Sequence, residues 1–394
     1  MAIACISITS IIRYNYQMSQ TGTIGIVGGG QLARMLTEPA LKLGFKVVVL
    51  NPSPNSPASQ VGAKEIIGDL YDGESLRKLA SEVDYITVEI EHLNVDVLRN
   101  LAEKGKQVNP SPDTIGMIQD KFAQKQFLAK AGIPLADFAE ITDLPSAEQA
   151  LRNFGGKMLI KTRHGAYDGR GNQVVSSSAE LKTALDNFEG QQLYAEKFVP
   201  FVKEVAVMIA RGQDGQIVNY PVTETIHERN ICVETLTPAA ITDAQRQRAE
   251  AVAHQVAEHL QGAGVFGIEM FLTESGQIIV NEIAPRVHNS GHYTIEACQT
   301  SQFEQNIRAI TGMTLGSTDL VVPAAAMVNI LGERDGPTET VGIDKAEQEP
   351  HTKVHIYGKS PTKIDRKMGH ITATGETIEE AKQRAEQARA LITI

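Results

Sequence analysis

Two glutamates near the middle of the chain are the residues best suited to chemistry. Glu269 and Glu282 lie in the segment VFGIEMFLTESGQIIVNEIAPR, which is expected to form two strands joined by a tight turn. The turn predicts that Glu269 faces Val280. Glu282 then lies diagonally across on the same face, roughly 7–8 Å away at the backbone. Two carboxylates on a mostly apolar hairpin are costly unless a cation lies between them. The sequence therefore predicts a Mg²⁺ site completed by nucleotide phosphates; two exposed strand acids are the alternative.

The loop after the second acid is rich in polar side chains. Residues 284–292 read APRVHNSGH and contain Arg286, His288 and His292. A single histidine in such a loop would more often be structural. Two histidines and an arginine beside an acid pair instead indicate a loop that faces a substrate.

A glycine-rich loop follows the first predicted strand. Residues 28–33 read GGGQLA and match the G-x-G-x-x-A pattern of dinucleotide-binding folds. That pattern also requires an acid at the end of the second strand, where this chain has Asn51, so an NAD-dependent dehydrogenase is disfavoured. The backbone N–H groups could still bind a phosphate or another polar ligand, with Gln31 facing it. A tight turn without a ligand is the alternative.

A second glycine-rich loop lies between two predicted strands. Residues 165–171 read GAYDGRG, and three glycines in seven residues indicate a flap whose backbone can approach a ligand closely. The loop is not a Walker motif, because no Lys-Ser/Thr follows and no helix begins there. Lys161, on the strand before it, could reach a phosphate. An ordinary hairpin loop with a surface lysine is the alternative.

The elements that must position these residues follow from the hydrophobic pattern. Apolar strands alternate with helical segments in the first part of the chain, which predicts a parallel α/β sheet at 21–118. A small mixed α+β unit is expected at 119–200. Further strands are expected at 85–90, 158–162 and within the hairpin 265–284, and helices at 74–81, 120–131, 243–260 and 296–311.

Charge and cysteine content exclude several classes of protein. The chain of 394 residues has a formal net charge of −10, which argues against a nucleic-acid-binding protein. Cys5, Cys232 and Cys298 form no CxxC pair and no metal-ligand cluster, which favours a reducing compartment.

The first residues do not resemble a targeting signal. The apolar start MAIACISITSII has no basic residue before Arg13, unlike a signal peptide. No apolar run approaches the ~18 residues of a membrane span. Residues 1–20 are therefore expected to be a disordered extension, with Met18 as a candidate start, and the protein is expected to be cytoplasmic without a membrane partner.

Several motifs together identify a family. In chain order they are GGGQLARM, TVEIEH at 87–92, QDKFAQK, the GAYDGRG flap, NEIAPRVHNSGH and RKMGH at 366–370. On these motifs the chain resembles the ATP-grasp ligases and, within them, the 5-(carboxyamino)imidazole ribonucleotide synthetases of purine biosynthesis. The resemblance extends from about Thr23 to the C-terminus. The combination of YDGRG with APRVHNSGH carries most of its specificity.

The resemblance implies a fold that combines α/β and α+β parts. A Rossmann-like pre-ATP-grasp domain would span 21–118, the small lid subdomain of the ATP-grasp fold 119–200, the large subdomain 201–318 and a C-terminal domain 319–394. ATP would bind between the two grasp subdomains. A homodimer is the expected assembly.

The resemblance also implies a reaction. Bicarbonate would attack the γ-phosphate of ATP, with Mg²⁺ present, and give carboxyphosphate and ADP. The exocyclic amine of aminoimidazole ribonucleotide would then take up the carboxyl group, or CO₂ released beside it. A downstream mutase would use the product.

The roles of individual residues follow from the resemblance alone. Those implied for ATP are Lys121, Lys161, the flap Gly165, Ala166, Tyr167, Asp168, Gly169, Arg170 and Gly171, the hinge Glu196, Lys197, Phe198 and Val199, and Glu204, His227, Asn281 and Glu282. Those implied for the acceptor are Gln31, Glu89, Tyr167, Arg286, His292, Arg366 and Lys367. Arg170, His288 and Lys359 are the implied catalytic residues, and Glu269 and Glu282 the implied metal ligands.

Two departures and two alternatives accompany this interpretation. Many ATP-grasp enzymes have Glu-x-Asn on the second strand, but Asn281 precedes Glu282 here, which puts a metal role for the asparagine in doubt. The flap begins Gly-Ala, and Ala166 is unsuited to a left-handed turn position. A sister enzyme, such as a formate-dependent glycinamide ribonucleotide transformylase or a biotin-dependent carboxylase subunit, is one alternative. A nucleotide-binding regulator without catalysis is the other.

Overall fold

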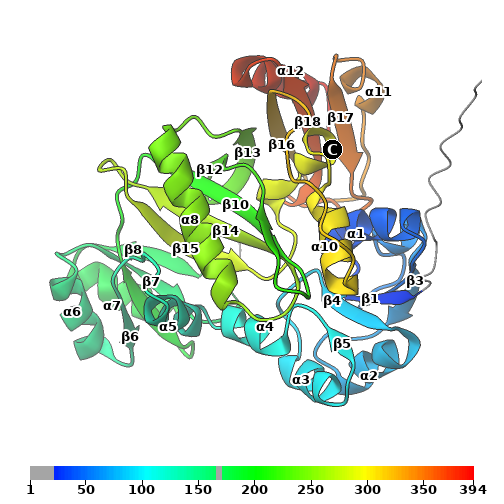
Figure 1. Cartoon of the computed structure of the whole chain (residues 1–394). Coiled ribbons are helices and arrows are strands. Elements are labelled where there is room, and N and C mark those ends of the chain that lie inside the picture. Colours follow the sequence, from blue (N-terminus) through cyan, green and yellow to red (C-terminus); the bar gives the residue numbers. More distant parts are fainter. Residues whose placement is uncertain (1–21, 166–170) are drawn as a thin grey trace, which may run out of the picture.

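The computed structural model describes residues 22–165 and 171–394. The strands of this part of the chain form three sheets (Figure 1). None of the described helices combines the length and the hydropathy that a bilayer-spanning segment requires.

The N-terminal sheet is parallel and has the strand order β3-β2-β1-β4-β5. Its strands are β1 (Thr23–Val27), β2 (Lys46–Asn51), β3 (Lys64–Ile67), β4 (Tyr85–Val88) and β5 (Gln107–Val108). Its helices are α1 (Gln31–Lys42), the 3-10 helix η1 (Ser59–Val61), α2 (Gly73–Glu82), α3 (Val95–Glu103) and α4 (Pro112–Gln119). The strand that follows β1 in the chain, β2, lies on one side of β1 in the sheet, and β4 lies on the other side of β1. The loops that follow β1 and β4 therefore lie side by side at the carboxyl edge, where α/β sheets bind ligands.

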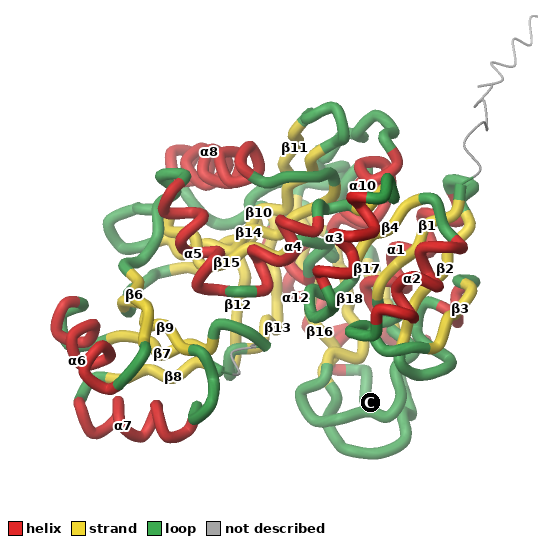
Figure 2. Tube along the Cα trace, turned by 90° about the horizontal axis from the view of Figure 1, so that it is seen from below, coloured by secondary structure: helices red, strands yellow, loops and turns green. Residues whose placement is uncertain are grey.

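A four-stranded antiparallel sheet forms a separate small unit. Its order is β6-β9-β7-β8, built from β6 (Phe138–Ile141), β7 (Met158–Thr162), β8 (Asn172–Val175) and β9 (Leu193–Lys197). Helices α6 (Leu144–Asn153) and α7 (Ser178–Asn187) pack on it over a core of its own. The unit lies at the opposite end of the molecule from the N-terminal sheet, as both views show (Figures 1 and 2).

The largest sheet runs through the middle of the molecule, in the order β15-β14-β10-β12-β13-β16-β18-β17, with β11 beside β10. Its strands are β10 (Lys203–Arg211), β11 (Ile217–Asn219), β12 (Thr223–Glu228), β13 (Ile231–Thr237), β14 (Gly264–Leu272), β15 (Ile278–Ala284), β16 (Ala324–Leu331), β17 (Thr352–Ile356) and β18 (Lys367–Gly375). The helices associated with it are α5 (Lys121–Lys130), α8 (Asp243–His259), η2 (Asn289–Gly291), α9 (Thr294–Ala297), α10 (Gln302–Thr311), α11 (Ile343–Ala346) and α12 (Ile378–Ala390). The sheet crosses the domain boundary expected at 318–319, because β16 pairs with β13.

One apolar core joins three of the expected domains. It contains Ile26 and Leu36 of the N-terminal domain, Phe303 of α10, and Met327 and Tyr357 of the C-terminal part. The small unit with β6–β9 does not share this core. That unit therefore has an apolar core separate from the one that joins the other three parts.

The expected helix at 296–311 is wrong. The chain forms the short α9 and then α10, with an extended segment between them. In that segment Gln299 N–H donates to the Asp319 carbonyl, and Cys298 forms an isolated antiparallel β-bridge with Leu320. The Ser301 side chain then accepts from Glu304 N–H and caps α10. Pairing with a distant segment therefore replaces the helical hydrogen bonds.

Candidate active site

The two glutamates predicted to bind a metal lie directly opposite each other. Glu269 pairs with Glu282, and Met270 pairs with Val280, so the predicted pairing of Glu269 with Val280 is wrong. A β-bulge leaves Asn281 without an opposite residue and shifts the register. The expectation that both carboxylates point to one face is confirmed, at closer range than predicted.

The two carboxylates have opposite electrostatic environments. Burial, and next the charge of Glu282, raise the pKa of Glu269 to about 7. Burial also acts on Glu282, but Lys121, whose Nζ lies 2.5 Å from Glu282 Oε2, lowers the pKa of that carboxyl to about 2. Ionisation of Glu269 beside the already ionised Glu282 is therefore unfavourable without a cation between them.

The oxygen donors of this pair fit a magnesium ion. No cluster of three or more His, Cys, Asp or Glu side chains is placed to bind a metal within 22–165 and 171–394. A cation at the pair would take two carboxylates from the described residues, with phosphates and water as its other ligands. This is how Mg²⁺ is commonly held beside nucleotides.

Two lysines converge on one buried glutamate beside the acid pair. Lys161 Nζ lies 2.7 Å from Glu196 Oε2, and Lys125 Nζ lies 2.7 Å from Glu196 Oε1. Burial opposes ionisation of Glu196, but the two lysines lower its pKa to about 2. Lys161 was predicted from the sequence. Lys125 was not, although it follows Lys121 by one helical turn in QDKFAQK and so shares its face.

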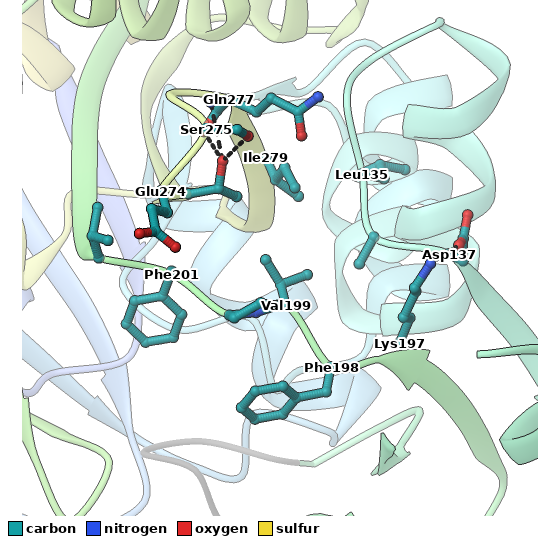
Figure 3. Close-up of a pocket in the computed structure, with 14 residues that line it drawn as sticks. Leu135, Asp137, Lys197, Phe198, Val199, Phe201, Glu274, Ser275, Gln277 and Ile279 are labelled. Atoms are coloured by element: carbon teal, nitrogen blue, oxygen red, sulfur yellow. Dashed lines mark hydrogen bonds and ion pairs between the residues drawn. The ribbon is translucent and has the colours of Figure 1, made fainter. Parts of the chain in front are cut away.

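The predicted hinge borders a cavity of about 500 Å³ (Figure 3). The cavity is lined by Leu135, Ala136, Asp137, the hinge residues Lys197, Phe198 and Val199, the following residues Pro200, Phe201 and Val202, and Thr273, Glu274, Ser275, Gln277 and Ile279. Figure 3 shows Val199 and Ile279 on opposite sides of it. Ile279 pairs with Phe271, which lies two residues from Glu269 on β14. The cavity and the acid pair therefore share one face of the hairpin.

Glu204 and His227 form a pair on the strands next to the acid hairpin. His227 Nδ1 lies 3.3 Å from Glu204 Oε2. Burial lowers the pKa of His227, but Glu204 outweighs it and the net shift is upward. Glu204 lies opposite Phe271 of β14, so the pair is close to the acid hairpin.

Glu89 occupies the first glycine loop. Its carboxylate accepts hydrogen bonds from the backbone N–H groups of Gly30 and of Ala33, the latter at 2.8 Å. A Cβ added to Gly28 or Gly30 would lie 2.4 or 2.8 Å from the Glu89 side chain. The glycines therefore make room for this carboxylate, and the chain itself fills the position expected for a phosphate or polar ligand. Gln31 opens helix α1 directly beside it.

Glu91 ties the N-terminal domain to the loop after β15. Arg286 Nε donates to Glu91 Oε2 at 2.7 Å, and Arg286 Nη2 donates to Glu91 Oε1 at 3.2 Å. Burial opposes ionisation of Glu91, but Arg286 lowers its pKa to about 2. Glu91 belongs to the TVEIEH motif at 87–92, but the sequence predicts an acceptor role only for Glu89 of that motif.

His288 lies between the acid pair and the loop. Its Nε2 is 3.4 Å from Glu269 Oε1, and its Nδ1 accepts a hydrogen bond from Ser290 N–H. Burial, and next Arg286, lower the pKa of His288 to about 3, so the ring is neutral. A Cβ on Gly267 would lie 2.8 Å from His288 Cβ, so the glycine on β14 leaves space for this side chain.

Gln302 holds the backbone of His288 from both sides. Its Oε1 accepts from His288 N–H at 2.9 Å, and its Nε2 donates to the His288 carbonyl at 2.7 Å. The same Nε2 lies 3.2 Å from His292 Nδ1. His292 is buried against the rings of Phe303 and His370, and burial lowers its pKa. The structure thus places His292 inside the core; its substrate role stays a prediction.

Two lysines of the C-terminal part, Lys359 and Lys367, act on residues of the candidate site, whereas Arg366 makes a local contact. Lys359 Nζ donates to the Lys367 carbonyl at 2.7 Å, and Arg366 Nη1 donates to the Pro361 carbonyl at 2.6 Å. Lys359 is close enough to Glu89 to favour its ionised form, although burial gives a net rise in the pKa of Glu89. Lys367 similarly contributes to lowering the pKa of His288.

A small pocket brings the two predicted groups of residues together. Lys121 and Glu282 of the nucleotide group and Arg286 and His288 of the acceptor group all line it, with Gly165 at the base of the flap. The flap residues Ala166, Tyr167, Asp168, Gly169 and Arg170 lie outside the described residues. Gly165 and Gly171, which border them, both have positive φ.

Family models match three consecutive parts of the chain. A ribonucleotide synthetase preATP-grasp domain matches residues 21–119, an ATP-grasp domain residues 126–303, and a phosphoribosylaminoimidazole carboxylase C-terminal domain residues 325–384. These matches confirm the predicted ATP-grasp fold with its preceding domain and C-terminal extension.

Relatives and solved structures are similar over nearly the whole chain. The phosphoribosylaminoimidazole carboxylase of Ogataea methanolica is 42% identical over 92% of this chain and 68% of its own length. Fungal and plant relatives of that name are longer, and the chain spans 64–68% of their length.

Two crystal structures match with a TM-score of 0.86. The N5-carboxyaminoimidazole ribonucleotide synthetase of Thermotoga maritima is 43% identical, over 95% of this chain and 99% of that chain. The Aspergillus clavatus N5-carboxyaminoimidazole synthase, in complex with ADP and 5-aminoimidazole ribonucleotide, is 36% identical over 94% and 98%. The chain therefore belongs to the family of N5-carboxyaminoimidazole ribonucleotide synthases, which are ATP-binding ligases of purine biosynthesis with the ATP-grasp fold.

Proposed function

We propose that this chain carboxylates the exocyclic amine of aminoimidazole ribonucleotide at the expense of ATP and bicarbonate. The observation that carries the proposal is the small pocket lined by Lys121 and Glu282 on the nucleotide side and by Arg286 and His288 on the acceptor side. A reaction that passes a carboxyl group from a phosphorylated intermediate to an amine needs both substrates at one place.

ATP would lie along one face of the β14–β15 hairpin. The hinge 196–199 and the adjoining cavity would receive the base, and Glu204 with His227 the ribose. Lys121 and Lys161 would contact the phosphates. A Mg²⁺ ion held by Glu269 and Glu282 would offset the negative charge of the transferring phosphoryl group.

The acceptor would lie between the loop 284–292 and the N-terminal and C-terminal domains. Arg286, His288, Lys359, Glu89 and Gln31 would contribute to this site; the charges of Lys359 and Arg286 both act on Glu89, which supports their proximity. The cations Arg366 and Lys367 suit the ribonucleotide phosphate. His292 would support the loop from behind, since it is buried.

The chemistry would proceed in two steps. A bicarbonate oxygen attacks the γ-phosphorus of ATP, which breaks the bond to ADP and forms carboxyphosphate. The amine then attacks the carboxyl carbon, or CO₂ released there, while phosphate leaves and the amine loses a proton. The flap 165–171 would exclude water, which otherwise hydrolyses carboxyphosphate. The family resemblance further supports a cytoplasmic homodimer whose product passes to a mutase.

A coupled assay of ADP release tests the proposal. ADP should form only when bicarbonate and aminoimidazole ribonucleotide are both present with Mg²⁺ and ATP. Stimulation by formate with glycinamide ribonucleotide instead would overturn the assignment in favour of the sister ligase. ATP binding without turnover under any of these conditions would favour a regulator.

A further inference from the structure

Lys125 is a buried charge that the proposed chemistry does not use. It lies on α5 and is only 2% exposed. Its Nζ is 2.7 Å from Glu196 Oε1 and 2.8 Å from the Asn281 carbonyl oxygen. Lysines are rarely buried to this extent unless the ammonium group has specific partners.

The first partner links Lys125 to a phosphate-binding candidate. Glu196 has two lysine partners, Lys125 on one carboxylate oxygen and Lys161 on the other. Two positive charges and one negative charge leave this buried cluster with an excess of one positive charge. Without Lys125, Glu196 and Lys161 would form a neutral pair, and the charge of Lys161 would no longer be available to attract phosphates.

The second partner links Lys125 to the acid pair. Asn281 is the bulged residue that brings Glu282 opposite Glu269. Its carbonyl oxygen accepts a hydrogen bond from the Lys125 ammonium group, which is a strong, charge-assisted interaction. Lys125 therefore stabilises the irregular backbone on which the register of the two carboxylates depends.

We propose that Lys125 is a positioning residue for the nucleotide site. It neutralises Glu196 so that Lys161 can bind phosphate, and it holds the bulge that places Glu282. It acts through these groups and does not contact substrate. The inference rests on the proposed nucleotide site. It goes beyond that site because it assigns a role to a residue that is not proposed to contact ATP.

Substitution with methionine, which keeps the unbranched stem and removes the charge, tests this role. We expect Lys125→Met to weaken binding of ADP with Mg²⁺ by about tenfold or more in calorimetry. The KM for ATP should rise in parallel, while the KM for aminoimidazole ribonucleotide should stay within about twofold. Lys130→Met, the same change at an exposed position of α5, is the matched control and should leave both unchanged. A folded Lys125→Met protein with normal ADP affinity would overturn the inference.

A double-mutant cycle with Glu196→Gln separates positioning from packing. Once Glu196 no longer carries a charge, Lys125 retains only its contact with the Asn281 bulge, so Lys125→Met in that background should weaken ADP binding several-fold less than it does in the unaltered protein. An equal loss in both backgrounds would show that Lys125 acts independently of Glu196, contrary to the inference. If Lys125→Met alone does not fold, a loss of about tenfold or more between Glu196→Gln and the double variant would still overturn the neutralising role.

The ADP measurements also distinguish this inference from the proposed function. If the unaltered protein binds ADP with Mg²⁺ but does not carboxylate aminoimidazole ribonucleotide, the proposed reaction is wrong. The cycle on ADP affinity still decides the role of Lys125.

Discussion

Two residues of the same type have opposite properties at the centre of the site. Glu269 and Glu282 lie opposite each other, and burial by itself would raise the pKa of each carboxyl. Only Glu282 has a lysine partner at 2.5 Å, so its pKa falls to about 2 while that of Glu269 rises to about 7. Adjacent carboxylates with such unequal environments are typical of sites that bind a cation or share a proton.

Loss of the charge on Glu282 should abolish catalysis. Glu282→Gln removes the charge of one of the two carboxylates proposed to bind Mg²⁺ and leaves Lys121 without its ionic partner. We expect kcat/KM for ATP to fall on the order of 100-fold or more, with a higher Mg²⁺ requirement in the ADP-release assay. Glu258→Gln, at an exposed position of α8, should retain normal activity. Near-normal turnover by Glu282→Gln would remove the metal-site assignment.

At the scale of elements, helix α10 fixes the loop that carries His288. The first residue of the helix, Gln302, bonds both backbone groups of His288, and the helix begins there because Ser301 caps it. The helix also carries Gln305, whose amide holds both backbone groups of Gly316 in the same way, at 2.8 and 2.9 Å. Two glutamine side chains of α10 thus make equivalent pairs of backbone contacts, but only Gln302 holds a residue of the candidate site, His288.

This pair of glutamines permits a controlled test. Gln302→Leu should lower kcat for carboxylation by roughly tenfold or more, because a loop misplaced by about 1 Å disturbs the reacting geometry. The KM for ATP should change little, since the backbone that Gln302 holds belongs to His288, which is proposed to lie on the acceptor side. Gln305→Leu removes a comparable pair of backbone contacts and should lower thermal stability to a similar degree with normal kcat. If both variants lose activity equally, Gln302 contributes only to stability.

At the scale of the whole molecule, the acceptor site depends on contacts between domains. One apolar core joins the N-terminal domain, α10 and the C-terminal strands, while the lid unit has a core of its own. The Glu91–Arg286 pair crosses from the N-terminal domain to the loop after β15. The proposed acceptor site would therefore be built on the part of the described molecule that shares one core, whereas the unit with β6–β9 has its own.

The Glu91–Arg286 pair should make stability depend on pH. The pKa of Glu91 is about 2 in the folded protein, below its ordinary value of 4.5. A lowered pKa means that the pair contributes its full stabilisation above pH 4.5 and loses it as the pH falls toward 2. The full contribution is on the order of 3 kcal/mol, of which roughly 2 kcal/mol should be lost between pH 6 and pH 3.

Urea denaturation of the unaltered protein and of Glu91→Gln at pH 6 and pH 3 checks this pH dependence of stability. The difference in unfolding free energy between the unaltered protein and the variant should shrink by about 2 kcal/mol from pH 6 to pH 3. Asp137→Asn, which disrupts an exposed ion pair with Lys197, should show little difference at either pH. A difference for Glu91→Gln that does not change with pH would contradict the expected ion pair.

The hydrophobic pattern and the motifs were enough to predict several elements and the chemical type of the site. The hydrophobic pattern predicted the strand at 158–162 and the helix at 243–260 to within a residue, because local propensity and periodicity decide them. The strand period placed Glu269 and Glu282 on one face, and the joint occurrence of motifs identified the family.

The contacts between distant side chains could not be predicted from local patterns and follow from the packing of the chain. Lys125 and Glu196 are 71 positions apart, and Arg286 and Glu91 are 195 apart, so no local pattern connects them. The carbonyl of the bulged Asn281 accepts a hydrogen bond from Lys125 of another element, and Glu89 fills the glycine loop because β4 lies beside β1. These contacts arise from strand order and from the need to pair buried charges, and both are properties of the packed molecule rather than of any segment.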